Sequence, residues 1–147
     1  MVPWFALLLI SLTVFSISLP VAYAQNETYH LSGLGATIIV GRDASLRVTE
    51  IIQFSHDTGA FTSAFRDIAW NGFDNIFNIT VADNNGTIVP FTQSFTNGNF
   101  HVQWTHPLEN APTKRTFVLN HTVTNALEQP TSTTNQLRWQ AGSSWSA

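Results

Sequence analysis

Apolar and polar residues alternate along most of this chain, and no helical period stands out after the first 24 residues. Because side chains of a strand point to opposite faces in turn, each alternating run predicts a strand with one buried face. The apolar members of the clearest runs are Leu46, Val48, Ile52 and Phe54; Phe77, Ile79 and Val81; Phe100, Val102 and Trp104; and Phe117, Leu119 and Val123.

Turn-forming residues separate these runs, with Asn-Gly in two of the turns. Seven or eight short strands at this spacing are typical of an all-β sandwich or barrel, and we expect an antiparallel β-sandwich. The predicted turns and loops are 41–44 between strands 35–40 and 45–54, 83–86 between 75–82 and 87–93, 97–99 between 91–96 and 100–106, 107–112 before 114–125, and 130–134 before 137–139.

The first 24 residues differ from the rest. They carry no charged side chain, and an apolar run leads through Pro20 to Ala22-Tyr23-Ala24. Ala22 and Ala24 fit the −3 and −1 positions of a secretory cleavage site, so we expect a signal helix that is removed after Ala24. The alternative is an uncleaved anchor, although the run is marginal against the ~20 residues that a membrane span needs. Residues 25–147 are then one domain that is secreted or at the cell surface.

Composition excludes several classes of function. The chain has six basic and nine acidic residues, a net charge of −3 and no cysteine. Since no basic run exists, we expect neither nucleic-acid binding nor attachment to an anionic lipid surface. A membrane contact would come through the N-terminal segment or through helices beyond this sequence. The lack of cysteine excludes thiol chemistry and disulfides, so the hydrophobic core must hold the fold by itself.

Four Asn-x-Thr sequons occur, at Asn26, Asn78, Asn85 and Asn120. Asn78 and Asn120 lie on the polar phase of their predicted strands, and Asn85 lies in a predicted turn. All could therefore carry an N-linked glycan without disturbing the core. In a host without N-glycosylation they are ordinary polar positions.

No motif in the chain specifies catalysis. Asp57-Thr58-Gly59 is the tripeptide of aspartic proteases, but the residues before it do not fit that family and a turn explains it as well. Phosphate-binding, dinucleotide-binding and serine-nucleophile motifs are missing, and the five histidines lack metal-ligand spacing, so we expect neither metal nor cofactor. The histidines are His30, His56, His101, His106 and His121.

A carbohydrate-active protein is the alternative to a non-catalytic domain. A glycosidase needs two facing carboxylates, and tryptophan can stack on sugar rings. Solvated or structurally paired carboxylates and core tryptophans are the simpler interpretation. The residues concerned are Glu50, Asp57, Asp67 and Asp83, and Trp70, Trp104, Trp139 and Trp145.

Several segments resemble the domain of unknown function 2207 family of predicted membrane proteins. The run Leu46–Glu50 is similar to its opening "apolar-x-Val-x-Glu" strand, and Phe65-Arg66-Asp67-Ile68 to its "Tyr/Phe-Arg-Asp-Ile" motif. Residues 116–127 look like its "tyr-x-val-x-x-ala" strand. Leu137, Trp139, Gly142 and Trp145 look like its "leu-x-trp-x-x-x-gly-x-x-trp" ending. The resemblance covers roughly residues 33–147.

The resemblance implies an extracytoplasmic β-rich domain behind a signal peptide, without an established activity. Family members continue into transmembrane helices, so this sequence is either a truncated piece or a free ectodomain. We therefore expect an interaction or structural role with a protein or carbohydrate partner outside the cell, and no catalytic site. The structural signature comprises Glu50, Arg66, Asp67, Trp139 and Trp145.

Glu50 shares the phase of Leu46, Val48, Ile52 and Phe54, so alternation points its carboxylate at the core. A buried carboxylate needs a partner, because an unpaired buried charge costs several kcal/mol. Arg66 is the nearest cation in the signature, and its planar guanidinium suits bidentate pairing. We therefore expect a buried Glu50–Arg66 ion pair.

Overall fold

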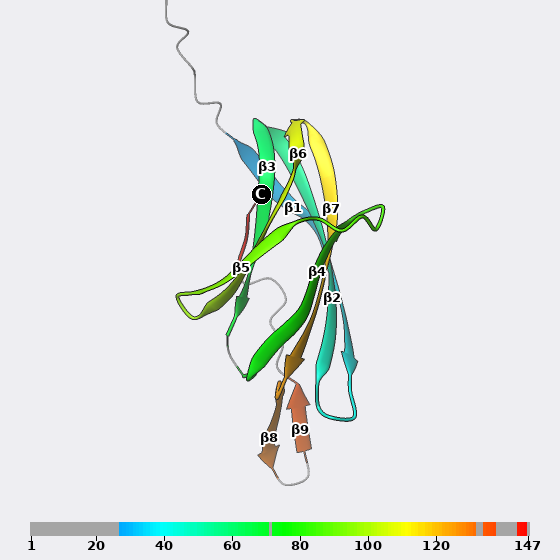
Figure 1. Cartoon of the computed structure of the whole chain (residues 1–147), viewed down its shortest axis with the longest axis vertical. Helices are drawn as coiled ribbons and strands as arrows, with labels where there is room; N and C mark the ends of the chain where they lie inside the picture. Colours follow the sequence, from blue (N-terminus) through cyan, green and yellow to red (C-terminus); the bar gives the residue numbers. More distant parts are fainter. Residues whose placement is uncertain (1–26, 71, 132–133, 138–143, 147) are drawn as a thin grey trace, which may run out of the picture.

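The computed structural model describes residues 27–70, 72–131, 134–137 and 144–146 (Figure 1). These residues form an all-β, antiparallel sandwich, which confirms the predicted fold class. The signal segment with Ala22 and Ala24, the sequon at Asn26, and Trp139 lie outside the described residues. Within the described ranges no helix is long and apolar enough to cross a membrane.

Two four-stranded sheets make up the sandwich. One has the strand order β1-β2-β7-β4, the other β10-β3-β6-β5, and β8 and β9 form a separate two-stranded sheet (Figure 1). The strands are β1 Thr28–Val40, β2 Leu46–Thr58, β3 Ala60–Ala69, β4 Asn75–Asp83, β5 Phe91–Thr96, β6 Asn99–Asn110, β7 Thr113–Thr124, β8 Leu127–Thr131, β9 Thr134–Leu137 and β10 Ser144–Ser146.

The core lies between the facing sides of the two sheets. Alternation on β2 and β7 places their apolar phase inward, as predicted, and β6 contributes Val102 and Trp104 from the other sheet. Trp104 is fully buried, and its ring centroid lies 5.3 Å from that of Phe117. Each fully buried large apolar side chain contributes about 1.5–3 kcal/mol. The hydrophobic core therefore stabilises the fold of a chain that has no cysteine and so no disulfide.

The predicted phase of β4 is wrong at its start. Ile76 and Val81 are buried, whereas Phe77 is 38% exposed. The pairing of β4 with β7 shifts between Phe77 and Thr80, and Asn78 has a φ of 52°. An irregularity of this kind adds a residue between two inward positions, so strict alternation no longer predicts which side chain is buried.

Two predicted connections also differ. The turn at 83–86 forms, and residues 87–89 pair with the end of β4 as predicted, through an antiparallel bridge between Ala82 and Ile88. The pairing stops there, because β5 crosses to the opposite sheet and pairs with β6. The predicted loop 107–112 is mostly strand, since β6 continues to Asn110. Pro107 lies opposite a register shift between β3 and β6, where a missing N–H breaks no regular ladder bond.

Candidate functional site

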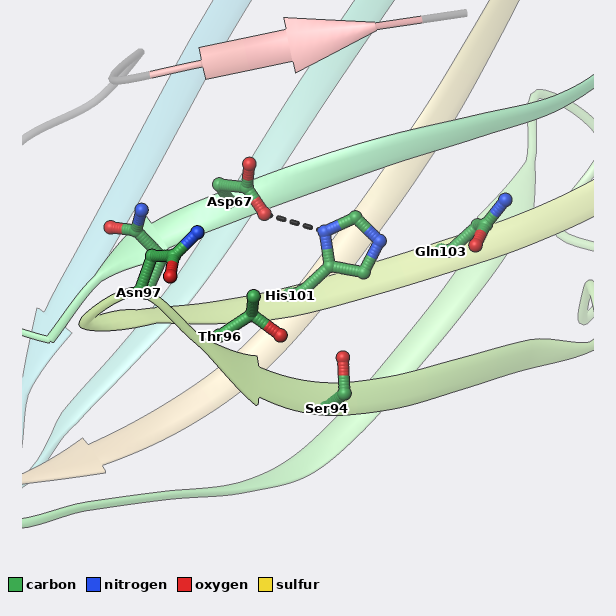
Figure 2. A pocket seen from close by; sticks show the side chains of 7 residues that line it. Asp67, Ser94, Thr96, Asn97, His101 and Gln103 are labelled. Carbon is green, nitrogen blue, oxygen red and sulfur yellow. Dashed lines mark hydrogen bonds and ion pairs between the residues drawn. The ribbon is translucent and has the colours of Figure 1, made fainter.

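Three polar side chains form a row across the outer face of the β10-β3-β6-β5 sheet. Asp67 of β3 pairs in register with His101 of β6, and His101 pairs with Ser94 of β5. The carboxylate Oδ1 of Asp67 lies 2.6 Å from Nδ1 of His101 (Figure 2). Because residues directly opposite in an antiparallel pair are close neighbours, this row brings Asp67 beside two residues of the β5–β6 hairpin that are distant from it in sequence.

An open hollow of about 380 Å³ surrounds this row. Figure 2 shows its walls coming from β3, β6, β5 and the β5–β6 turn. The turn has φ of 52° at Asn97 and 74° at Gly98, which is the primed geometry that Asn-Gly favours in two-residue hairpins. The described lining residues are Asp67, Ser94, Thr96, Asn97, Asn99, His101 and Gln103.

The chemistry of the hollow is that of hydrogen bonding. An ionised Asp67 can only accept, so Nδ1 of His101 donates to it, and Nε2 of the neutral ring is then an acceptor. Figure 2 shows the edge of the ring that carries Nε2 facing away from Asp67. Side-chain amides and hydroxyls supply the remaining donors and acceptors.

The row has the residue types of a catalytic triad, but its geometry is not that of one. A triad requires the serine hydroxyl within about 2.6–3.2 Å of the second histidine nitrogen. Among the described residues, His101 makes its side-chain hydrogen bond to Asp67, and Ser94 makes none to His101. Ser94 is exposed on an edge strand. In this structure the row is therefore a hydrogen-bonded Asp67–His101 pair with a serine beside it in register.

The expected Glu50–Arg66 pair lies directly beneath this surface. Nε and Nη2 of Arg66 donate to the two carboxylate oxygens of Glu50 at 3.1 and 3.2 Å, and both side chains are 0% exposed. Arg66 also donates through Nη1 to the main-chain carbonyl of Asp67. Since Glu50 is on β2 and Arg66 on β3, the pair links the two sheets through the core and anchors the backbone of Asp67.

The other predicted carboxylates do not face one another. Asp57 contacts His30 at 2.8 Å, where β1 pairs with β2. Asp83 accepts from the backbone N–H groups of Asn85 and Thr87 in its turn. Each of these four carboxylates therefore has a hydrogen-bond partner within the fold; the four are Glu50, Asp57, Asp67 and Asp83. Asp57-Thr58-Gly59 is the end of β2 and a turn, with φ of 95° at Gly59.

The two candidate tryptophans whose side chains the structure describes, Trp70 and Trp104, pack in or against the core. Trp104 is 0% exposed. Trp70 is partly buried and packs against Phe73, Phe95 and Phe100. The backbone of Trp145 in β10 pairs with Arg66. The two tryptophans with described side chains are thus part of the packing, as the simpler interpretation held.

Sequence reasoning missed the burial of three histidines. His56 and His106 stack with ring centroids 6.1 Å apart, and His56 also stacks on Phe61 at 4.0 Å. Burial lowers the pKa of His56, and the neighbouring His106 lowers it further. Burial also lowers the pKa of His121 to about 4, with a smaller contribution from Arg66. The alternation of β7 could have predicted the burial of His121, because this residue has the same phase as Leu119 and Val123 on the inward side of the strand.

The three described sequon asparagines are not in the core. Asn78 and Asn85 are exposed. Asn120 is partly exposed, and its side chain accepts from the hydroxyl of Thr49 at 2.7 Å and donates to that of Thr80 at 3.3 Å. All three belong to β4, the turn after it, or β7, and so to the sheet opposite the polar hollow.

In the part of the chain that the structure describes, no three potential metal ligands come together. The chain matches no protein-family model, and no curated protein matches it. Its function is therefore inferred from the geometry of the described residues.

Proposed function

We propose that this chain is a non-catalytic interaction domain that works outside the cytosol and binds a ligand in the polar hollow of the β3-β6-β5 face. The observation that carries the proposal is the hollow itself. Seven polar side chains from three strands and one turn converge there on an outer sheet face, although such a face needs no concavity for stability. Its volume of about 380 Å³ lies at the lower end of the range of small-ligand sites, in which convergent polar groups orient the ligand, although most such sites have a more apolar lining than this one.

Three features support the location. The pattern of residues 1–24 is that of a secretory signal, the sequons suit an exported protein, and the segments quoted above resemble an extracytoplasmic domain of the domain of unknown function 2207 family. In that interpretation the sheet with β4 and β7 carries glycans, and the opposite sheet meets the ligand.

The test is a titration of the ¹⁵N-labelled exported protein, followed by amide chemical shifts. The probes are neutral oligosaccharides, sulfated and sialylated oligosaccharides, and a mixture of soluble peptides. We expect shifts that cluster at Ser94, Thr96 and His101 with one probe class. Ser94→Arg should abolish them because it fills the hollow, whereas Thr37→Arg, an exposed β1 position on the other sheet, should not.

Two results would contradict the proposal. One is that no probe shifts the amides around the hollow, or that all shifts map elsewhere. The other is that new resonances appear as a probe is turned over, because a non-catalytic domain leaves its ligand unchanged.

Glycan occupancy gives an independent prediction. In a eukaryotic secretory host, we expect Asn85 and Asn78 to be modified more completely than Asn120, because both are exposed whereas the Asn120 amide is held by two threonines. Peptide mass spectrometry before and after glycosidase treatment measures this. Thr87→Ala is the control, since it destroys the Asn85 sequon and keeps the backbone bond of residue 87 to Asp83. An unmodified Asn85 would count against the glycoprotein assignment.

A further inference from the structure

We infer that the ligand of the hollow is a neutral saccharide. This inference rests on the proposed function and names the chemistry that the site selects. It does not depend on Trp70 and Trp104, which pack in or against the core, but on the side chains that line the hollow.

The charge of the lining excludes anions. Among its described residues, Asp67 and His101 are the ionisable groups. With a neutral imidazole the lining carries one negative charge, and with a protonated imidazole the two charges cancel. In neither state is there a net positive charge to offset a sulfate, phosphate or carboxylate, and burying an unpaired charge is costly.

The donors and acceptors suit adjacent hydroxyl groups. Asn97, Asn99 and Gln103 each present an acceptor and a donor side by side on a planar amide. Two neighbouring hydroxyls of a sugar, each both donor and acceptor, can bind such a group in a bidentate manner. The hydroxyls of Ser94 and Thr96 can each donate or accept a hydrogen bond.

An apolar surface borders the polar groups. Phe65 lies two residues before Asp67 on the outward phase of β3, and its ring centroid is 5.0 Å from that of His101. Phe65 therefore supports the imidazole from the side, while Asp67 fixes the ring through Nδ1. A pyranose has polar edges and a less polar face, so it matches a site in which a ring pair adjoins amides and hydroxyls.

A peptide is the less favoured ligand. A peptide that adds a strand binds the backbone groups of a sheet edge. The groups that converge here are side chains on the face of the sheet. Most come from β3 and β6 in the middle of the strand order, and the edge strand β5 contributes the side chains of Ser94 and Thr96. An extended backbone offers no vicinal hydroxyls to these amides.

The experiment is an array of neutral oligosaccharides and their sialylated and sulfated counterparts, probed with the exported protein multimerised through a tag because single-site binding is expected to be weak. We expect binding to neutral members and loss of binding on adding a sulfate or sialic acid. Asp67→Asn should weaken binding about tenfold or more, since it removes charge-assisted hydrogen bonds.

The chain provides a matched control. Asp57 and His30 form a second Asp–His contact, at 2.8 Å, on the other sheet and outside the hollow. Asp57→Asn should leave array binding unchanged. If both variants lose binding equally, the effect is general and the inference is overturned.

The outcomes separate the inference from the proposed function. Preference for acidic glycans, or binding of peptides alone, with sensitivity to Ser94→Arg, overturns the neutral-saccharide inference and leaves the binding hollow intact. Binding of neutral glycans that Ser94→Arg does not affect overturns both. Binding of no glycan on the array overturns the inference, and the amide titration then decides the proposed function independently.

Discussion

Glu50→Gln should lower the free energy of unfolding by about 3 kcal/mol, because it leaves the buried guanidinium of Arg66 without its countercharge. Both side chains are fully buried, and their two hydrogen bonds join β2 to β3 across the core. Urea unfolding at pH 7, followed by tryptophan fluorescence, measures the change. Arg66→Met should cost a similar amount.

The double variant is the decisive part of this experiment. If the pair acts as a unit, Glu50→Gln combined with Arg66→Met costs less than the sum of the single changes. The partly exposed pair of Glu109 and Arg115, in which Nε donates to the carboxylate at 2.6 Å, is the control. Glu109→Gln should cost at most about 1 kcal/mol, as for other solvent-accessible ion pairs. Additive energies for Glu50 and Arg66 would show that they do not stabilise the fold as a pair.

Acid should destabilise the protein through His121. Its pKa is lowered from 6.5 to about 4 in the folded state, chiefly by burial. The folded state therefore binds the proton less readily than the unfolded chain does. The stability contributed by the neutral ring is complete above pH 6.5 and is lost as the pH falls from 6.5 towards 4. Linkage gives a loss of about 2–3 kcal/mol by pH 4.5.

Unfolding free energies between pH 7.5 and 4.5 measure this loss. His121→Leu replaces the buried imidazole with an apolar side chain that does not titrate. The free energy of unfolding of this variant should therefore fall less over the same pH interval. His56, whose pKa is also lowered by burial, acts in the same direction and accounts for part of the slope that remains. Equal slopes for wild type and His121→Leu would contradict the assignment.

The sequence predicted the sandwich because β2, β6 and β7 are regular, with one apolar phase that meets a partner sheet. It also predicted the Glu50–Arg66 pair, since a carboxylate in an apolar phase requires a cation. Strand β3 escaped prediction as a strand. Its inward positions include Arg66 and its outward ones Phe65, so the polarity of its two faces is locally inverted.

The candidate site could not be predicted for a different reason. Asp67, His101 and Ser94 are ordinary residues in the sequence, and they form a row through the pairing of β3 with β6 and of β6 with β5. The Asn-Gly turn at 97–98 predicts that β5 and β6 are neighbours, and so that Ser94 lies near His101. Periodicity assigns Asp67 to a face, but nothing in the sequence specifies that β3 lies beside β6 in the register that brings Asp67 to His101.

The strand order has a consequence for how the chain folds. Leu46 of β2 pairs with Val123 of β7, and Arg66 of β3 pairs with Trp145 of β10. Because such distant segments must meet, the loss of chain entropy precedes most of the stabilising contacts, and folding of this kind is slow. As the chain leaves a ribosome or a translocation pore, the edge of β2 that pairs with β7 and the edge of β3 that pairs with β10 stay unpaired until those later strands emerge. During that interval the chain depends on chaperones, or on its own solubility, to avoid aggregation.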